Sequence, residues 1–294
     1  MKIREVKINK FKRFTDLTIK DIPGTAKLVI LVGPNGCGKT SIFEAFNHWY
    51  KYKGYSRWNN NHQSYFVKNG DNDTLGPGFW VDNRVDIIAY DEPLNEQNNI
   101  KGKFYFRTAH RNEPDFTTQH LSKQEDPRNS NRFDTLMATD ITVSSNYQRL
   151  VSNTLSGVFD ASNNRKTVEE LREKLIGKIK KSLSNVFDDL QFSNIGEPLV
   201  NGSFYFTKGR SENFHYKNLS AGEKSAFDII LDLVIKSDSF DNSVYCIDEP
   251  EAHMHTALQA KLLAEMYNLI NYKSQLWLAT HSIGMLQQAK ELET

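Results

Sequence analysis

The sequence predicts an α/β fold with a mixed central sheet and an inserted, mainly helical lobe. Three observations support this prediction. Leu28–Val32 is a continuous apolar run, typical of a strand covered on both faces, and a glycine-rich loop and a helical pattern follow it directly. A second apolar run, residues 244–247, ends in two acidic residues. Between these runs, residues from about 115 to 240 have a mainly helical pattern.

The composition is typical of a folded chain in water. Of the 294 residues, 38% are hydrophobic and 25% are charged, and the formal net charge of +1 indicates no overall attraction to nucleic acid or to a membrane. The two cysteines, Cys37 and Cys246, are too few for a disulfide framework or a four-cysteine zinc site. No apolar run approaches the roughly 18 residues of a membrane span, and the charged start is unlike a secretory signal. We therefore expect a cytoplasmic protein with no membrane partner.

Residues 1–114 are expected to form the first part of the core. The spacing of apolar residues predicts two strands before Pro23 and further strands at residues 85–90 and 103–107. A helix is expected from about residue 39 to residue 50. Residues 51–80 are rich in Asn, Gly and aromatic residues and have no clear period, so we interpret them as an irregular excursion.

Residues 115–240 are expected to form the helical lobe, and residues 241–294 are expected to form the rest of the core. Alternatively, residues 1–114, 115–240 and 241–294 together form one composite domain, 1–294. Apolar residues at helical spacing predict helices over about 167–189 and 220–236, and residues 192–195 and 203–206 predict a hairpin between them. In the last part we expect a helix over 254–270, a strand over 276–279 and a final short helix.

A phosphate-binding motif lies between the first apolar run and the helix after it. Residues 33–40 read GPNGCGKT and fit the pattern G-x-x-x-x-G-K-[ST]. Glycine has no Cβ, so backbone N–H groups in such a loop can turn inward around phosphate oxygens. Lys39 would bring a positive charge to the β and γ phosphates, and Thr40 would offer its hydroxyl to Mg²⁺. The motif predicts nucleotide binding by Gly33, Pro34, Asn35, Gly36, Cys37, Gly38, Lys39 and Thr40.

Two acids, Asp248 and Glu249, follow the second apolar run. A buried strand that ends in an aspartate delivers a carboxylate to a metal ion at the carboxyl edge of a parallel sheet. We therefore predict that Asp248 binds Mg²⁺ and that Glu249 is the general base that activates a water molecule. The alternative is a pair of surface acids after a strand, which the phosphate-loop motif disfavours.

Two further segments have both a local and a functional interpretation. In residues 218–224, Ser220 and Glu223 fit a capping box, and on these residues alone we favour that role. A serine and a glycine at a helix start, here Ser220 and Gly222, also make a phosphate-binding end. A lone histidine is usually structural or solvated. His281, however, follows a short apolar strand, where a γ-phosphate sensor is expected.

In this order, the four motifs resemble those of ATP-binding-cassette (ABC) ATPases of the SMC-like branch, which includes RecF and the OLD-family proteins. Residues 248–255 read DEPEAHMH and are similar to the D-E-P-E-x-H-L-H element of OLD-type and related bacterial antiphage-defence AAA-type ATPases. Residues 9–14, NKFKRF, are similar to the N-x-F-[KR]-x-[FL] start of this branch. The stretch FYFRTAHR, residues 104–111, is a weaker match to uncharacterised bacterial ATPases.

The resemblance implies a P-loop NTPase fold of the ABC type with ATP and Mg²⁺ as ligands. It also implies a head-to-tail homodimer or a higher homo-oligomer, in which Ser220 and Gly222 of one subunit contact the nucleotide of another. Lys12 and Arg13 would lie near the nucleotide. The other implied roles are phosphate and Mg²⁺ binding for Gly33 to Ser41, metal binding for Asp248, water activation for Glu249 and γ-phosphate contact for His281.

The chain departs from the family pattern in three places. Its signature reads Ser-Ala-Gly-Glu where transporters have Ser-Gly-Gly-Gln, which argues against a transporter subunit. Its glutamine loop has no clear counterpart, and we interpret the candidates Gln97, Gln119 and Gln124 as solvated side chains. It ends in a short helix, whereas OLD proteins continue into a TOPRIM-type nuclease domain, so we favour a fragment of a longer ATPase.

Two functions follow from the resemblance. The first is an ATPase that gates a nuclease or toxin effector in bacterial antiphage defence, which the short lobe and the DEPEAHMH element favour. The alternative is a DNA repair or recombination ATPase that clamps DNA, which a salt-dependent affinity for DNA would report.

Two local patterns have alternatives of their own. His253 and His255 could bind a metal ion, but we favour a dimer-contact loop there. A group of aromatic and basic residues resembles a stacking surface for DNA or RNA, with ordinary packing an equal alternative. This group comprises Trp49, Tyr50, Tyr52, Tyr55, Trp58, Lys51, Lys53 and Arg57.

Overall fold

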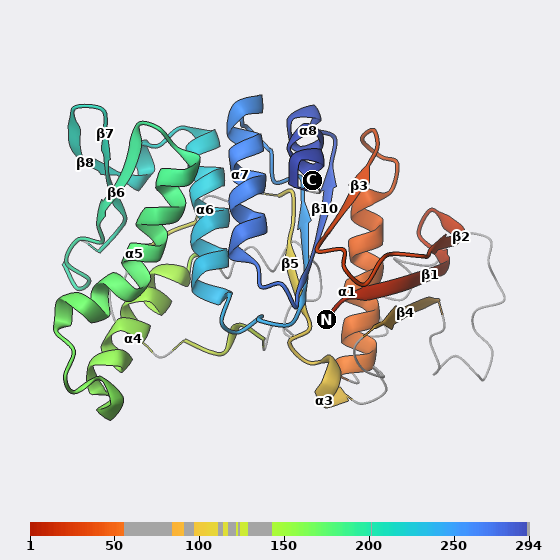
Figure 1. Cartoon of the computed structure of the whole chain (residues 1–294), viewed down its shortest axis with the longest axis horizontal. Helices are drawn as coiled ribbons and strands as arrows, with labels where there is room; N and C mark the ends of the chain where they lie inside the picture. Colours follow the sequence, from red (N-terminus) through yellow and green to blue (C-terminus); the bar gives the residue numbers. More distant parts are fainter. Residues whose placement is uncertain are drawn as a thin grey trace.

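The computed structural model describes residues 1–55, 84–90, 97–110, 114–116, 122, 124–128, 143–200 and 202–292. In these residues three sheets and the helices around them form the layers drawn in Figure 1. An antiparallel sheet lies at one end, a parallel sheet in the middle and a lobe of helices with a third sheet at the other end.

The central sheet is parallel and has the strand order β3 (Leu28–Val32), β10 (Gln275–Thr280), β9 (Val244–Asp248), β5 (Phe104–Arg107). The continuous apolar runs of the sequence are explained by burial on both faces, since alternate side chains enter two separate hydrophobic cores. Trp277 and Cys246 face one core, and Leu278 and Ile247 face the other.

The first core lies between the central sheet and an antiparallel sheet of order β2 (Phe14–Ile19), β1 (Ile3–Phe11), β4 (Val85–Ala89). Helix α1 (Lys39–Tyr55) fills this core, and Phe46 packs edge-on against Trp277 with ring centroids 5.1 Å apart. The short helix α3 (Gln97–Ile100) packs beside α1.

Helix α1 corrects two expectations. It continues to Tyr55, five residues past the expected end at residue 50. Trp49 and Tyr50 are 3% and 2% exposed because they pack against Phe104, so these two rings belong to the core and not to a nucleic-acid stacking surface. Tyr52 and Tyr55 have no described side-chain positions, and Arg57 and Trp58 lie outside the described residues.

The second core joins the other face of the central sheet to the lobe. The lobe contains the helices α4 (Asn146–Phe159), α5 (Val168–Val186) and α6 (Ala221–Lys236). Its sheet has the order β6 (Leu190–Asn194), β7 (Tyr205–Lys208), β8 (Ser211–His215). The expected hairpin is confirmed as β6 and β7, but the lobe has a third strand, β8, that the sequence pattern did not indicate.

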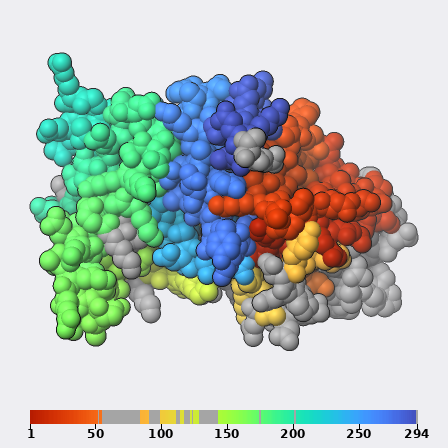
Figure 2. Space-filling view, viewed as in Figure 1, coloured from red at the N-terminus to blue at the C-terminus, as the bar shows by residue number. Residues whose placement is uncertain are grey.

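The C-terminal helices α7 (Thr256–Leu269) and α8 (Ile283–Leu292) complete the covering layer. Figure 2 shows this segment, in blue, filling the surface between the N-terminal residues and the lobe. Helix α7 begins at Thr256, two residues later than expected, because residues 249–255 form a loop. Among the described residues, no helix has the length and apolarity that crossing a bilayer requires.

Candidate nucleotide site

The loop between β3 and α1 has the geometry of a backbone cradle. Gly36 and Gly38 have φ angles of +77° and +109°, a region that glycine adopts without a steric penalty. A Cβ on Gly38 would lie 2.8 Å from carbon atoms of Arg13 and Phe14, so the turn between β1 and β2 closes over the loop. Glycine with positive φ at these two positions fits a bound phosphate group, which needs the backbone close by and no Cβ in the way.

Lys39 is held inside this loop. Lys39 is 7% exposed, and its Nζ donates hydrogen bonds to the carbonyl oxygens of Gly33 (2.8 Å) and Pro34 (3.2 Å). The Lys39 ammonium group is thereby held against the first two residues of the loop.

Thr40 and Asp248 meet although they are far apart in the sequence. The Thr40 hydroxyl donates a hydrogen bond of 2.6 Å to Asp248 Oδ2, and Asp248 is 3% exposed. Strand β9 delivers Asp248 to the carboxyl edge of the parallel sheet, where α1 begins. Hydroxyl and carboxylate oxygens are the ligands that Mg²⁺ prefers, so these two residues fit the metal ion that the motifs imply.

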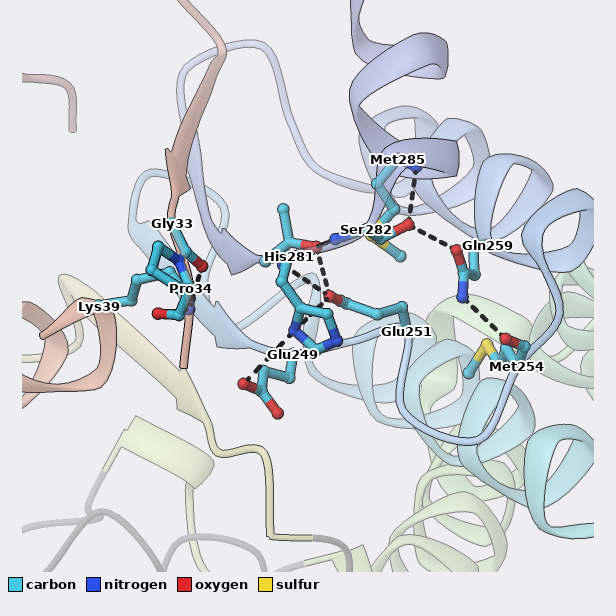
Figure 3. Close-up of polar contacts among 11 residues, drawn as sticks. Gly33, Pro34, Lys39, Glu249, Glu251, Met254, Gln259, His281, Ser282 and Met285 are labelled. Atoms are coloured by element: carbon cyan, nitrogen blue, oxygen red, sulfur yellow. Dashed lines mark hydrogen bonds and ion pairs between the residues drawn. The ribbon is translucent and has the colours of Figure 1, made fainter. Parts of the chain in front are cut away.

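Glu249 and His281 lie side by side at the ends of neighbouring strands. His281 Nδ1 is 3.7 Å from Glu249 Oε1, and half of the histidine side chain is exposed. The backbone of Glu249 is left-handed, with φ at +43°, and its N–H donates to the carbonyl oxygen of Ala279. This conformation is unusual for a residue with a Cβ and occurs where the surrounding structure enforces it. Figure 3 shows the His281 ring beside Glu249 and Glu251, with Gly33 and Pro34, which follow β3, nearby.

Lys12 and Arg13 differ in their contacts. Lys12 pairs with Glu44 on α1, while the aliphatic part of Arg13 packs over Gly38 of the phosphate loop. The described contacts therefore bring Arg13 to the loop and Lys12 to the side of the helix that follows it.

Ser220 has the local role that its sequence context favours. It is the N-cap of α6, its hydroxyl accepts from the Glu223 N–H, and Glu223 accepts from the Ser220 N–H at 2.8 Å. Ser220 is nevertheless exposed, and its side-chain hydrogen bonds within the described part of the chain are with Glu223 and not with the phosphate loop. The capping role and a contact with a second subunit are therefore compatible.

Gly222 packs against the backbone of the loop after Glu249. A Cβ at Gly222 would lie 2.6 Å from the carbonyl oxygen of His253, closer than real Cβ atoms come to backbone. Both segments also line a pocket of about 590 Å³ with the end of α5 and the start of α7. The described residues, His253 and His255 included, contain no group of three His, Cys, Asp or Glu side chains that could hold a metal ion.

We expect Gly222→Ala to reduce the free energy of unfolding by about 1–3 kcal/mol, because the methyl group has to displace backbone rather than a side chain. Gly157→Ala is the matched control, since a Cβ at this helical position meets only ordinary contacts at 3.9 Å. Gly157→Ala should change the same quantity by less than about 1 kcal/mol, in the stabilising direction. Urea unfolding of both variants measures the difference, and equal effects would contradict the packing argument.

The three candidates for the glutamine loop, Gln97, Gln119 and Gln124, lie in different places. Gln124 hydrogen-bonds with Gln148 on α4, within the lobe. Gln97 is in α3, and Gln119 is outside the described residues. None of these observations links a glutamine to the site.

The sequence arguments missed two groups of residues. The first is Glu251, which is buried and accepts a hydrogen bond from the His281 backbone N–H. The sequence indicates only that Glu251 belongs to the DEPEAHMH element. Arg107 ends strand β5 beside β9 and is buried near Asp232 and Lys236 of α6. An arginine at the end of the apolar strand FYFR is the sequence feature that marks Arg107 as unusual. The sequence does not reveal that its partner lies on α6.

The fold and this arrangement of loop, strand ends and acidic residues define a P-loop domain of the α/β class. A family model described as "AAA domain, putative AbiEii toxin, Type IV TA system" matches residues 28–286. The chain belongs to this family. No curated protein sequence matches it.

A solved structure supports the fold. The chain is similar to the structure described as "Crystal structure of the SmcHead bound to the C-winged helix domain of ScpA", with a TM-score of 0.57 and 12% identity over 98% of this chain and 92% of that chain. An SMC head domain from Thermotoga maritima aligns over the same shares, with a TM-score of 0.49 and 13% identity. The first similarity confirms the predicted α/β fold as that of an SMC head, an ABC-type P-loop fold.

Proposed function

We propose that this chain binds ATP with Mg²⁺ and hydrolyses it to ADP and phosphate. The single observation that supports this most strongly is the hydrogen bond between Thr40 and Asp248, which joins the phosphate loop to the acidic strand end. Glu249 and His281 lie next to this pair on strand ends of the same sheet edge. Membership of a family of AAA domains supports nucleotide chemistry independently.

Each residue has one role in this mechanism. Backbone N–H groups of the loop and the Lys39 ammonium hold the β and γ phosphates, and Thr40 and Asp248 hold the metal ion. Bound Mg²⁺ would neutralise charge that develops on the phosphate oxygens. Glu249 accepts the proton of the attacking water, and His281 donates a hydrogen bond to the γ-phosphate.

A second copy of the chain would complete each site. Ser220 is exposed at the start of α6, whereas Gly222 in the same turn is buried against the loop that follows Glu249. A helix start attracts an anion, so we assign both residues to the nucleotide of the partner. ATP would then hold two subunits together head to tail, and hydrolysis would release them. Such a molecule acts as a slow switch.

The biological role that fits best is control of a nuclease or toxin effector in antiphage defence, by a chain close to the OLD proteins. The AbiEii toxin in the description of the matching family supports it. DNA clamping is the second candidate, and the similarity to an SMC head is the observation that favours it. A DNA affinity that falls steeply with salt would support the second candidate.

Replacement of Lys39 tests the proposed nucleotide site. We expect Lys39→Ala to weaken ATP binding about 10- to 100-fold, because one or two charge-assisted hydrogen bonds to phosphate are lost. Isothermal titration with a non-hydrolysable ATP analogue and Mg²⁺ measures the affinity. Lys290→Ala, on the exposed side of α8, is the control and should leave the affinity unchanged. Equal affinities of Lys39→Ala and the unmodified chain would refute the site.

A further inference from the structure

Glu251 is a buried carboxylate in the loop that follows Asp248 and Glu249. It is 4% exposed, and its Oε1 accepts hydrogen bonds from the Thr280 hydroxyl and from the His281 backbone N–H, the latter at 3.1 Å. The same oxygen lies 3.6 Å from His281 Nδ1. Three polar groups of the turn that carries His281 thus lie around one carboxylate oxygen (Figure 3).

The polar contacts continue from this turn to the loop beside Gly222. The Ser282 N–H donates to Thr280 Oγ1 at 2.9 Å, and the Ser282 hydroxyl donates to Gln259 Oε1. Gln259 Nε2 in turn donates to the carbonyl oxygen of Met254 at 2.7 Å. Figure 3 shows this chain of contacts running from His281 to Met254.

The burial of Glu251 needs an explanation, because removing a carboxylate from water is costly unless hydrogen bonds compensate for it. Here the compensating groups all belong to residues 280 and 281 and all contact Oε1, while Oε2 is buried with no hydrogen-bond partner among the described residues. The loop itself contains two left-handed residues, Glu249 and His253, with φ at +43° and +67°. The chain therefore holds a strained loop against the histidine turn, and Glu251 is the link that contacts residues 280 and 281 directly.

We propose that Glu251 is the positioning residue of His281, a role that rests on the proposed hydrolysis of ATP. It fixes the turn by two hydrogen bonds to Thr280 and His281 and keeps the Nδ1 edge of the ring toward the carboxylates. The Nε2 edge is then left for the nucleotide. Glu251 does not touch the nucleotide, and its effect on hydrolysis passes through His281.

A double-mutant cycle tests this role. We expect Glu251→Ala to lower kcat about 10- to 100-fold with KM changed less than about threefold, since phosphate binding by the loop remains intact. In the His281→Ala background the same substitution should change kcat less than about threefold, because residues that act as a unit are not additive. Glu251→Gln keeps an oxygen that accepts from Thr280 and His281, and it should recover kcat to within about fivefold of the unmodified chain.

Two results would overturn the proposal. One is an equal loss of kcat from Glu251→Ala in both backgrounds, and the other is a glutamine variant no better than alanine. Glu265→Ala controls for the general cost of removing a buried glutamate, because Glu265 is 5% exposed and bonded to Asn185 on α5. It should lower the unfolding temperature without lowering kcat in the folded protein.

A spectroscopic measurement separates this proposal from the proposed function. In protein labelled with ¹⁵N-histidine, the ring signals of His281 are assigned by their absence in His281→Ala. Glu251→Ala should shift these signals and leave those of His48 on α1 and His215 in the lobe, which lie away from this loop, in place. If the unmodified chain hydrolyses no ATP, the proposed function fails while this spectrum still decides the positioning role, and unchanged His281 signals would exclude it.

Discussion

Replacing Glu249 by glutamine is expected to lower the rate of ATP hydrolysis by about 10²- to 10⁴-fold, because the amide cannot accept the proton of the attacking water. ATP should remain bound, since the loop, Lys39 and Asp248 are untouched. Glu249 directly follows β9, and its Oε1 lies 3.7 Å from His281 Nδ1. Phosphate release at saturating ATP and Mg²⁺ measures the rate.

Glu169→Gln is the matched control, because Glu169 is exposed in the first turn of α5. It should hydrolyse ATP at the rate of the unmodified chain. A Glu249→Gln variant that retains more than about a tenth of the normal rate would remove Glu249 from the role of general base.

Asp232→Ala is expected to reduce the free energy of unfolding by about 3–5 kcal/mol, because it leaves buried cations without their carboxylate. Asp232 is 1% exposed, accepts from Asn146 at 2.7 Å and pairs with Lys236 at 2.5 Å. Tyr105 of strand β5 also donates to it, so this carboxylate joins the central sheet, α4 and α6. Urea unfolding at neutral pH measures the loss.

The same variant has a predicted pH dependence. Burial opposes ionisation of Asp232, but the Lys236 ammonium and the Arg107 guanidinium together hold its pKa below the usual range. A lowered pKa contributes stability that is present above the unfolded value of about 3.9 and is lost as the pH falls through the folded value. The difference between Asp232→Ala and the unmodified chain should therefore shrink below about pH 4.

Asp188→Ala is the control for this experiment. Asp188 pairs with Lys261 at 2.7 Å, but its side chain is 89% exposed, so water and salt screen the pair. Its loss should cost less than about 1 kcal/mol. Equal losses in the two variants would mean that the buried cluster does not stabilise the junction of sheet and lobe.

The central sheet could be predicted because β9 and β10 are buried on both faces and the edge strand β3, although only partly buried, packs against both cores. Leu28–Val32 and residues 244–247 are apolar without interruption, and no helical period competes with that pattern. The phosphate loop was equally clear, because its spacing demands a strand before it and a helix after it. Strand β8, SENFH, is largely exposed on an edge, so it carries no apolar alternation and was missed.

The roles of Glu251 and Asp232 depend on partners that sequence spacing does not reveal. Glu251 binds residues 280 and 281, and Asp232 meets Arg107, each across a large separation along the chain. The length of α1 was underestimated for a related reason. The burial of Trp49 and Tyr50 against β5 stabilises its second half. The helix therefore continues into residues whose sequence has no helical period.

The shared-site dimer is tested most directly by the mass in solution of the Glu249→Gln variant, measured by light scattering with and without ATP and Mg²⁺. This variant should keep ATP bound long enough for the assembly to be observed. Without nucleotide we expect the mass of one chain, 33.8 kDa. With ATP and Mg²⁺ we expect a dimer or a larger assembly, and Ser220→Arg should prevent it. An unchanged mass while ATP is demonstrably bound would contradict the shared site.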